Sequence, residues 1–122
     1  MTAEIEDHSF WEFSLRVYGA DGVPAACIHL QDHYGLDVNV LLFCLWLGHC
    51  GRGRLRPEEL TSVLAASSAW NKEVVCGLRA VRNRLRESVG DVPSEQSTAM
   101  GKQILDIEIQ CEHVEQLVLA TS

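Results

Sequence analysis

The feature that most constrains this chain is the run Val38–Leu47, VNVLLFCLWL, in which Asn39 is the only polar residue. Asp37 precedes the run and Gly48 follows it, and these residue types are typical of the two ends of a helix. A helix that is apolar on every side has to be enclosed by other helices. It is too short to cross a bilayer, which takes roughly 20 apolar residues. We therefore expect an all-α fold, a compact bundle of five to six helices around a central helix over about residues 37–48.

Residues 1–122 are expected to form a single helical domain, with residues 1–8 frayed. Ser9 and Glu12 have the spacing of a capping box, in which Ser caps the first helix and Glu reaches back to it. The Ser- and Ala-rich stretch over residues 67–71 predicts a bend or break between two helices. The expected helices cover about residues 9–18, 23–33, 37–48, 57–67, 71–88 and 94–121.

The last two expected helices carry the clearest apolar periodicity. In the first of them the stripe consists of Val74, Leu78, Val81 and Leu85. In the long amphipathic C-terminal helix it consists of Met100, Ile104, Ile107, Cys111, Val114 and Val118. A heptad pattern sustained for so few turns favours packing against the helix's own domain over a coiled coil. Contact with a protein partner or a second copy is the alternative.

The net charge of −7 is unevenly distributed along the chain. Residues 52–86 hold eight Lys or Arg against three acids, whereas the segments before and after are acidic. This layout predicts internal charge pairing as readily as an anionic partner. The five cysteines are odd in number and stand mostly among apolar neighbours, which indicates reduced thiols. The acidic N-terminus has no apolar signal segment. We therefore expect a cytoplasmic protein with no membrane contact.

No motif for catalysis or metal binding stands out. His29 and His33 are one helical turn apart, but the glutamate of an HExxH motif and a third ligand are missing. Cys44 and Cys50 lack CxxC spacing, and the glycine-rich segment 48–53 lacks the GK[ST] ending of a phosphate-binding loop. The sequence therefore predicts no catalytic residue, no metal ligand and no cofactor, and it favours a protein that is not an enzyme.

Four polar residues gather where the second helix meets the central helix. They are Gln31, Asp32, Asp37 and Asn39. Asp37 and Asn39 can cap the central helix, and Asp32 could pair with an arginine of the fifth helix. Burying such groups is costly unless each is hydrogen-bonded, so a bonded joint that fixes the hairpin is one interpretation. A polar pocket for a small ligand or a partner's backbone is the other.

The fifth helix carries Arg79, Arg82 and Arg86 at helical spacing. A solvated face or intramolecular salt bridges would explain them, and contact with a partner or an anionic ligand is the alternative. Nucleic-acid binders usually have a basic domain and a recognisable motif. This acidic chain has neither, so we do not expect nucleic-acid binding.

The chain also resembles an uncharacterised family of short bacterial proteins, found mainly in proteobacteria. The most specific resemblance is the block from Leu30 to Gly48, LQDHYGLDVNVLLFCLWLG. Further matches are FWEFSLRVY at residues 10–18 and Trp70 followed by VVCGLRAVR at residues 74–82. The resemblance spans about residues 9–86 and implies no activity, cofactor or partner. It directs attention to the polar residues of its motifs: Gln31, Asp32, Asp37, Asn39, Arg79 and Arg82.

These observations lead to two hypotheses about function. The first is a non-catalytic interaction or regulatory module in the cytoplasm, docking through the C-terminal helix or through the face of Arg79, Arg82 and Arg86. The second is a protein or enzyme that binds an anionic or zwitterionic metabolite, or a metal ion, in a polar Asp/Asn/Arg pocket.

Overall fold

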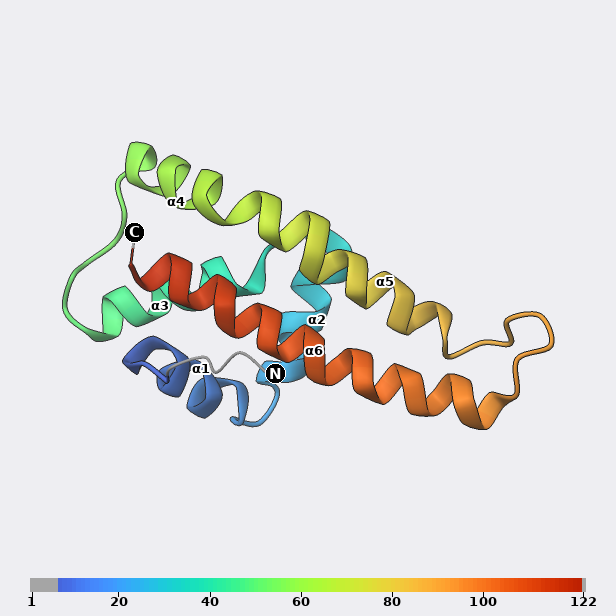
Figure 1. The fold of residues 1–122 in the computed structure, drawn as a ribbon. Coiled ribbons are helices and arrows are strands. Elements are labelled where there is room, and N and C mark those ends of the chain that lie inside the picture. Colours follow the sequence, from blue (N-terminus) through green and yellow to red (C-terminus); the bar gives the residue numbers. More distant parts are fainter. Residues whose placement is uncertain (1–6, 122) are drawn as a thin grey trace.

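The computed structural model of the chain describes residues 7–121. These residues form six α-helices and one π-helical turn, and no strand occurs among them. The elements are α1 (Ser9–Tyr18), α2 (Val23–Tyr34), α3 (Val38–His49), α4 (Pro57–Trp70), η1 (Asn71–Val75), α5 (Cys76–Arg84) and α6 (Ser94–Ala120). The all-α prediction is confirmed (Figure 1). The N-terminus was predicted to be frayed over residues 1–8, and residues 1–6 of this range lie outside the described part of the chain.

Helix α3 supplies half of the buried apolar cluster. The cluster consists of Phe10, Phe13, Val40, Leu42, Phe43, Leu47, Val63 and Leu119, from α1, α3, α4 and α6. The Phe10 ring stacks on that of Trp46 with 5.4 Å between the ring centres. Leu45 is 50% exposed, so one side of α3 faces solvent. Burial of each such side chain contributes about 1.5–3 kcal/mol, so α3 supplies much of the core. The helix that packs against most of the others is α6, which contacts α1, α3, α4, η1 and α5, so the prediction that α3 is the centre of the bundle is wrong.

The first helix begins differently from the prediction. His8 is its N-cap, with Nδ1 accepting a hydrogen bond from the backbone N–H of Trp11 at 3.3 Å. Ser9 is already helical, so the predicted capping box with Glu12 is wrong. Asp37 caps α3 as predicted, because its Oδ1 accepts from the Asn39 N–H at 3.0 Å. Gly35, with a φ of 63°, ends α2 in the left-handed conformation that glycine tolerates best.

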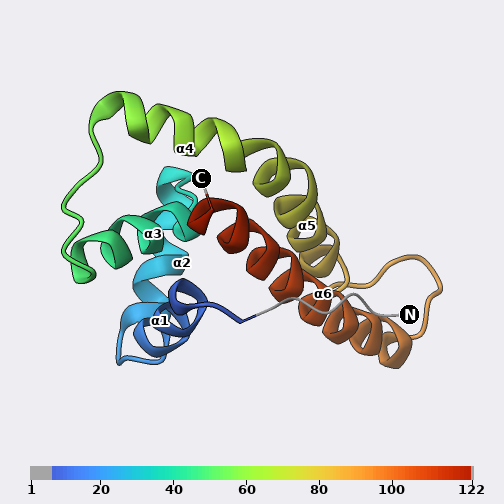
Figure 2. The ribbon, with the colours of Figure 1, turned by 60° about the vertical axis from the view of Figure 1, so that its left-hand side comes forward.

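Of the bend or break predicted near residues 67–71, the structure has the bend, at a π-helical turn over η1. The chain runs without interruption from α4 through η1 into α5, as one long bent helix (Figure 2). The Cys76 N–H bonds to the Asn71 carbonyl five residues back, so η1 holds more residues than an α-helical turn would. The extra residue rotates everything that follows. Val75 is consequently fully buried, whereas Val81, predicted to face the core, is 50% exposed.

The long helix α6 lies along α4 and α5 and also contacts α1 and α3 (Figure 1). It packs on its own domain as predicted, but with a different face. Its buried side chains are Ser97, Glu108, His113, Glu115, Gln116 and Leu119. Met100, Ile107 and Val118 of the predicted apolar stripe are 57%, 47% and 38% exposed. The face of α6 that turns inward is therefore largely polar.

None of the helices within residues 7–121 combines the length and the apolar composition that a bilayer crossing requires.

Candidate functional site

A cavity of about 660 Å³ lies between α1, α2, α3, α5 and α6, and we call it the interhelical cavity. This volume is within the range of ligand pockets in proteins, about 300–1,000 Å³. One part of the wall is apolar: Trp11, Leu15, Tyr18, Ile28, Leu36, Leu42, Leu105 and Ile109. The other part is polar and comes from the α2–α3 hairpin, α5 and α6.

All six residues that the sequence singled out line this one cavity: Gln31, Asp32, Asp37, Asn39, Arg79 and Arg82. Gln31 and Asp32 come from the end of α2, and Asp37 and Asn39 from the start of α3. The two arginines reach it from α5. Residues about 40 to 50 positions apart along the chain thus share one wall, because α5 and the hairpin both border the cavity.

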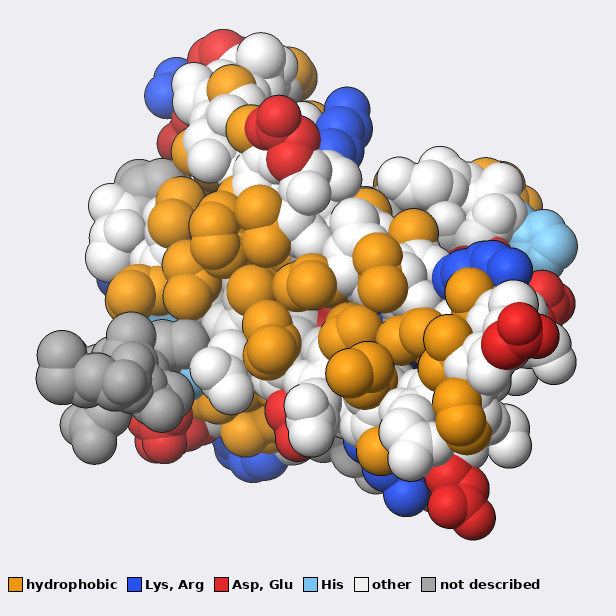
Figure 3. All heavy atoms as spheres, turned by 45° about the vertical axis from the view of Figure 1, so that its right-hand side comes forward, with side chains coloured by type: hydrophobic (Ala, Val, Ile, Leu, Met, Phe, Trp, Pro, Cys, Tyr) orange, Lys and Arg blue, Asp and Glu red, His pale blue; other side chains and the backbone are white. Residues whose placement is uncertain are grey.

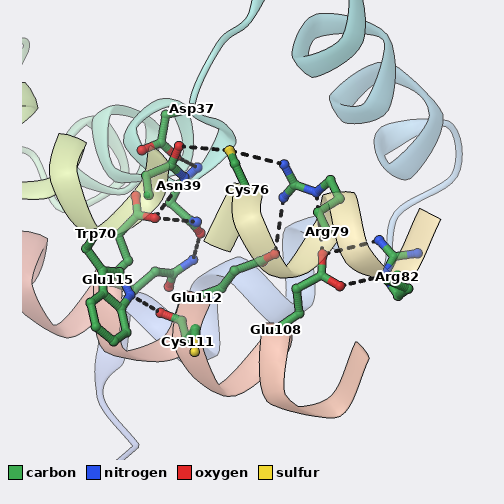
Figure 4. Close-up of polar contacts among 12 residues, drawn as sticks. Asp37, Asn39, Trp70, Cys76, Arg79, Arg82, Glu108, Cys111, Glu112 and Glu115 are labelled. Atoms are coloured by element: carbon green, nitrogen blue, oxygen red, sulfur yellow. Dashed lines mark hydrogen bonds and ion pairs between the residues drawn. The ribbon is translucent and has the colours of Figure 1, made fainter. Parts of the chain in front are cut away.

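The two arginines are paired with acids of α6 (Figure 4). Arg82 donates from Nε and Nη2 to the two carboxylate oxygens of Glu108. The Nε of Arg79 lies 3.4 Å from Glu108 Oε1, and its Nη2 lies 3.6 Å from Glu112 Oε1. The Glu108 side chain is 2% exposed, and those of the arginines are 20% or less. These are buried ion pairs, in which removing one partner leaves a costly unpaired charge.

A second polar group surrounds Glu115, which is fully buried. Its Oε1 accepts hydrogen bonds from Asn39 Nδ2 at 3.3 Å and from Asn71 Nδ2 at 3.0 Å. Gln116 Nε2 donates to Asn39 Oδ1 at 2.9 Å. Burial, together with a hydrogen bond to Asp37, raises the pKa of Glu115 to about 9. The neutral carboxyl form of Glu115 is therefore favoured at pH 7, and its O–H can donate to Asp37.

The π turn connects these two groups. Cys76 Sγ lies 3.5 Å from Asn71 Oδ1 and accepts a weak contact from Arg79 Nη1 at 3.8 Å. Asn71 and Cys76 are five residues apart, and the π-helical geometry brings their side chains into contact. The polar wall is thus one continuous network from Asp37 to Arg82.

Two buried oxygens of the cavity wall have no hydrogen-bond partner among the described residues. They are Ser14 Oγ and Gln116 Oε1. Ser14 is 4% exposed and Gln116 is 2% exposed. Buried polar atoms are nearly always hydrogen-bonded, and a group left without a partner costs about 1–3 kcal/mol. Both residues border the interhelical cavity.

Several expectations about the hairpin need correction. Asp32 is exposed at the rim and makes no ion pair with an arginine within residues 7–121, because Arg79 and Arg82 are both held by α6. Asn39 does not cap α3, since its side chain bonds to Glu115 and Gln116. For the arginines, the interpretation as intramolecular salt bridges is confirmed for Arg79 and Arg82. The interpretation as a solvated face holds only for Arg86, which is exposed.

The sequence analysis missed the acids and amides that hold the arginines and the hairpin: Asn71, Glu108, Glu112, Glu115 and Gln116. A signal for them was present. Glu108, Glu112 and Glu115 follow one another at spacings of 4 and 3, like the apolar stripe beside them. Arg79 and Arg82 are three residues apart, so they lie on one side of their helix and can face a stripe of acids on a neighbouring helix.

Burial also raises the pKa of Glu112, against the opposing effect of Arg79, and it raises the pKa of the Tyr18 hydroxyl. Both groups line the cavity, so its interior disfavours charge that lacks a partner. Within residues 7–121 no three His, Cys, Asp or Glu side chains lie close enough together to hold one metal ion.

Comparison with curated proteins and with solved structures finds no match to this chain. Comparison with protein families matches residues 9–119 to one family. The matched range includes the hairpin, both arginines and the acids of α6. The match extends the resemblance, which the sequence placed over about residues 9–86, across α6. The chain therefore belongs to the family described as "Protein of unknown function (DUF2390)".

Proposed function

We propose that this protein binds a small organic molecule in the interhelical cavity. The observation that carries the proposal is a cavity of about 660 Å³ whose wall contains the buried, unpartnered oxygens of Ser14 and Gln116. A pocket of this size is large enough for a small organic molecule. Binding without chemistry is favoured, because Arg79, Arg82 and Glu108 are already engaged with one another.

The setting that fits this proposal is a reducing one. All five cysteines lie within the described residues and are free thiols. Together with the family resemblance, this supports a bacterial cytoplasmic protein, which is the setting we propose.

A thermal-shift screen against a metabolite library tests the proposal. A ligand present at 100 times its Kd stabilises the folded state by about 2.7 kcal/mol. The variant Ile28→Trp fills the cavity from a residue that is 51% exposed, so it should fold but lose the ligand-induced shift. Leu64→Trp is the matched control, because Leu64 is 43% exposed on α4 and lies outside the cavity wall.

Two results would contradict this function. One is a broad library that yields no stabilising compound. The other is a hit whose shift is the same in wild type, Ile28→Trp and Leu64→Trp, since that compound would bind elsewhere.

A second candidate function is self-association through α6. An apolar stripe runs along this helix from Met100 to Val118, a length of about 27 Å. Met100, Ile107 and Val118 are exposed, and Cys111 and Val114 between them are half-buried. The space-filling view shows how apolar side chains gather into a broad band on one face of the molecule (Figure 3). No charged residue belongs to the stripe, so two copies of a chain with net charge −7 can approach there without local repulsion. We propose a second copy as the occupant.

Analytical ultracentrifugation tests the second candidate. The wild type should sediment as a dimer, and Ile107→Glu should shift it to a monomer by placing a charge in the contact. Thr98→Glu adds the same charge on the opposite side of α6, at an exposed position, and should leave the dimer unchanged. A monomeric wild type would refute this candidate without affecting the cavity.

A further inference from the structure

The charges around the interhelical cavity do not balance. Two arginines, Arg79 and Arg82, and four carboxylates line it. The carboxylates are Asp32, Asp37, Glu108 and Glu112. The arginines are taken up by Glu108 and Glu112, as their ion pairs show. No Lys, and no other Arg or His, belongs to the described wall, so Asp32 and Asp37 face the cavity without a cation.

Hydrogen-bonding capacity is unbalanced in the same direction. The unpartnered Gln116 Oε1 is an acceptor, since only the amide nitrogen of that side chain is used, in its bond to Asn39. The Asp32 carboxylate makes no hydrogen bond or ion pair with any described residue, and it too can only accept. Ser14 Oγ can donate or accept. The acceptors Gln116 Oε1 and Asp32 thus have no donor among the described residues, and N–H groups of a ligand would supply one.

The remainder of the cavity is apolar and aromatic. Trp11 and Tyr18 of α1, with Leu105 and Ile109 of α6, contribute apolar and aromatic surface to the same wall. Such a surface accommodates a hydrocarbon or aromatic body, and it does not replace the water around a strongly hydrated group. The cavity thus combines negatively charged, acceptor-rich groups with apolar surface.

From these two imbalances we infer that the ligand is an organic amine cation with an apolar body, its ammonium group held by Asp32, Asp37 and Gln116. This inference rests on the proposed function and specifies its ligand class. It replaces the anionic metabolite expected from the arginines, because those arginines are already neutralised by α6.

Matched compounds that differ only in charge provide the test. Tryptamine, tryptophol and indole-3-propionate share one ring system and carry an ammonium, a hydroxyl and a carboxylate. Phenethylamine, phenethyl alcohol and 3-phenylpropionate form a second set, and decylamine, decanol and decanoate a third. Isothermal titration calorimetry should show that the amine binds at least tenfold more tightly than both partners of its set, which corresponds to about 1.4 kcal/mol.

A pair of variants locates the charge effect. Asp32→Asn removes one unpaired carboxylate from an exposed position without disturbing a described hydrogen bond, so the fold should be retained. It should weaken amine binding several-fold and leave the alcohols unaffected. Asp91→Asn changes the net charge equally in the loop between α5 and α6, away from the cavity wall, and should not alter amine binding.

The outcomes separate the ligand class from the existence of a site. If alcohols or carboxylates bind as tightly as the amines, or if a divalent cation such as Mg²⁺ stabilises the protein and amines do not, the inference is wrong while a cavity ligand remains. If amines bind but Asp32→Asn and Asp91→Asn weaken them equally, the effect is that of net charge, and the inference is also wrong. If no compound of any charge binds in these sets or in the library, the proposed function fails together with it.

Discussion

Glu115 is the residue whose chemistry is most altered by the fold. A carboxyl group of this kind ordinarily has a pKa of 4.5, and in the folded protein burial and the hydrogen bond to Asp37 raise it to about 9. Between these two values the unfolded chain releases the proton and the folded chain keeps it. Stability must therefore fall as the pH rises from about 4.5 to about 9, because the folded state holds the proton that the unfolded state releases.

The variant Glu115→Gln should remove this pH dependence. Glutamine is neutral at every pH, and its amide can donate to Asp37 where the carboxyl proton does now. We expect the variant to melt several degrees above the wild type near pH 8.5 and close to it near pH 5, as 1 kcal/mol corresponds to roughly 3–6 °C for a chain of this size.

Circular-dichroism melting curves at a series of pH values measure this difference. Glu87→Gln, at an exposed position after α5, serves as the control and should run parallel to the wild type. Parallel curves for Glu115→Gln as well would show that Glu115 is ionised in the folded state.

At the scale of single residues, the sequence led to one half of the site. Gln31, Asp32, Asp37 and Asn39 could be chosen because polar residues beside two apolar helices are conspicuous. Their partners on α6 could not be chosen in the same way, because acids on a long helix usually face water. Burial of Glu108 and Glu115 depends on where α5 and η1 place their donors, which is a property of the packing.

Among the helices, α3 tolerates change least. Leu42 is 5% exposed, belongs to the apolar cluster and also borders the cavity. Leu42→Asp should abolish cooperative unfolding, because an unpaired buried charge costs several kcal/mol out of a typical total stability of 5–15 kcal/mol.

Leu45→Asp provides the comparison for this variant. Leu45 is on the same helix but 50% exposed, and we expect the variant to retain a cooperative melt within about 1 kcal/mol of the wild type. A soluble Leu42→Asp variant that melts cooperatively would show that water reaches the core side of α3.

Hydrophobic periodicity predicted where the helices lie. It did not predict which face is buried when a neighbouring element determines how the helix is rotated about its axis. The stripe of Val74, Leu78, Val81 and Leu85 assumes one uninterrupted α-helix, whereas η1 adds a residue and turns Val81 outward. For α6, the apolar stripe was the obvious candidate for the buried face. The structure buries the neighbouring polar stripe instead, because Arg79, Arg82, Asn39 and Asn71 all require partners on that side.

Across the whole molecule, the uneven charge distribution is explained in part by internal pairing. Arg79 and Arg82 belong to the basic segment 52–86, and they neutralise Glu108 and Glu112 of the acidic segment that follows. The other acidic segment contributes Asp32 and Asp37, which face the cavity without a cation. The basic segment is thus paired with the acids of α6, whereas the two aspartates of the first acidic segment have no cationic partner in the cavity wall. The sequence shows the charges, and the structure shows which of them are paired.

The number of residues in the long helix α4–η1–α5 fixes the direction in which its later side chains point. Deleting or inserting one residue between Pro57 and Arg84 would swing the guanidinium groups of Arg79 and Arg82 by about 100° around the axis, away from their carboxylates. The connectors over residues 50–56 and 85–93 have no such constraint. Members of this family that differ in length are therefore expected to gain or lose residues in those connectors, while the stretch between them keeps a constant count.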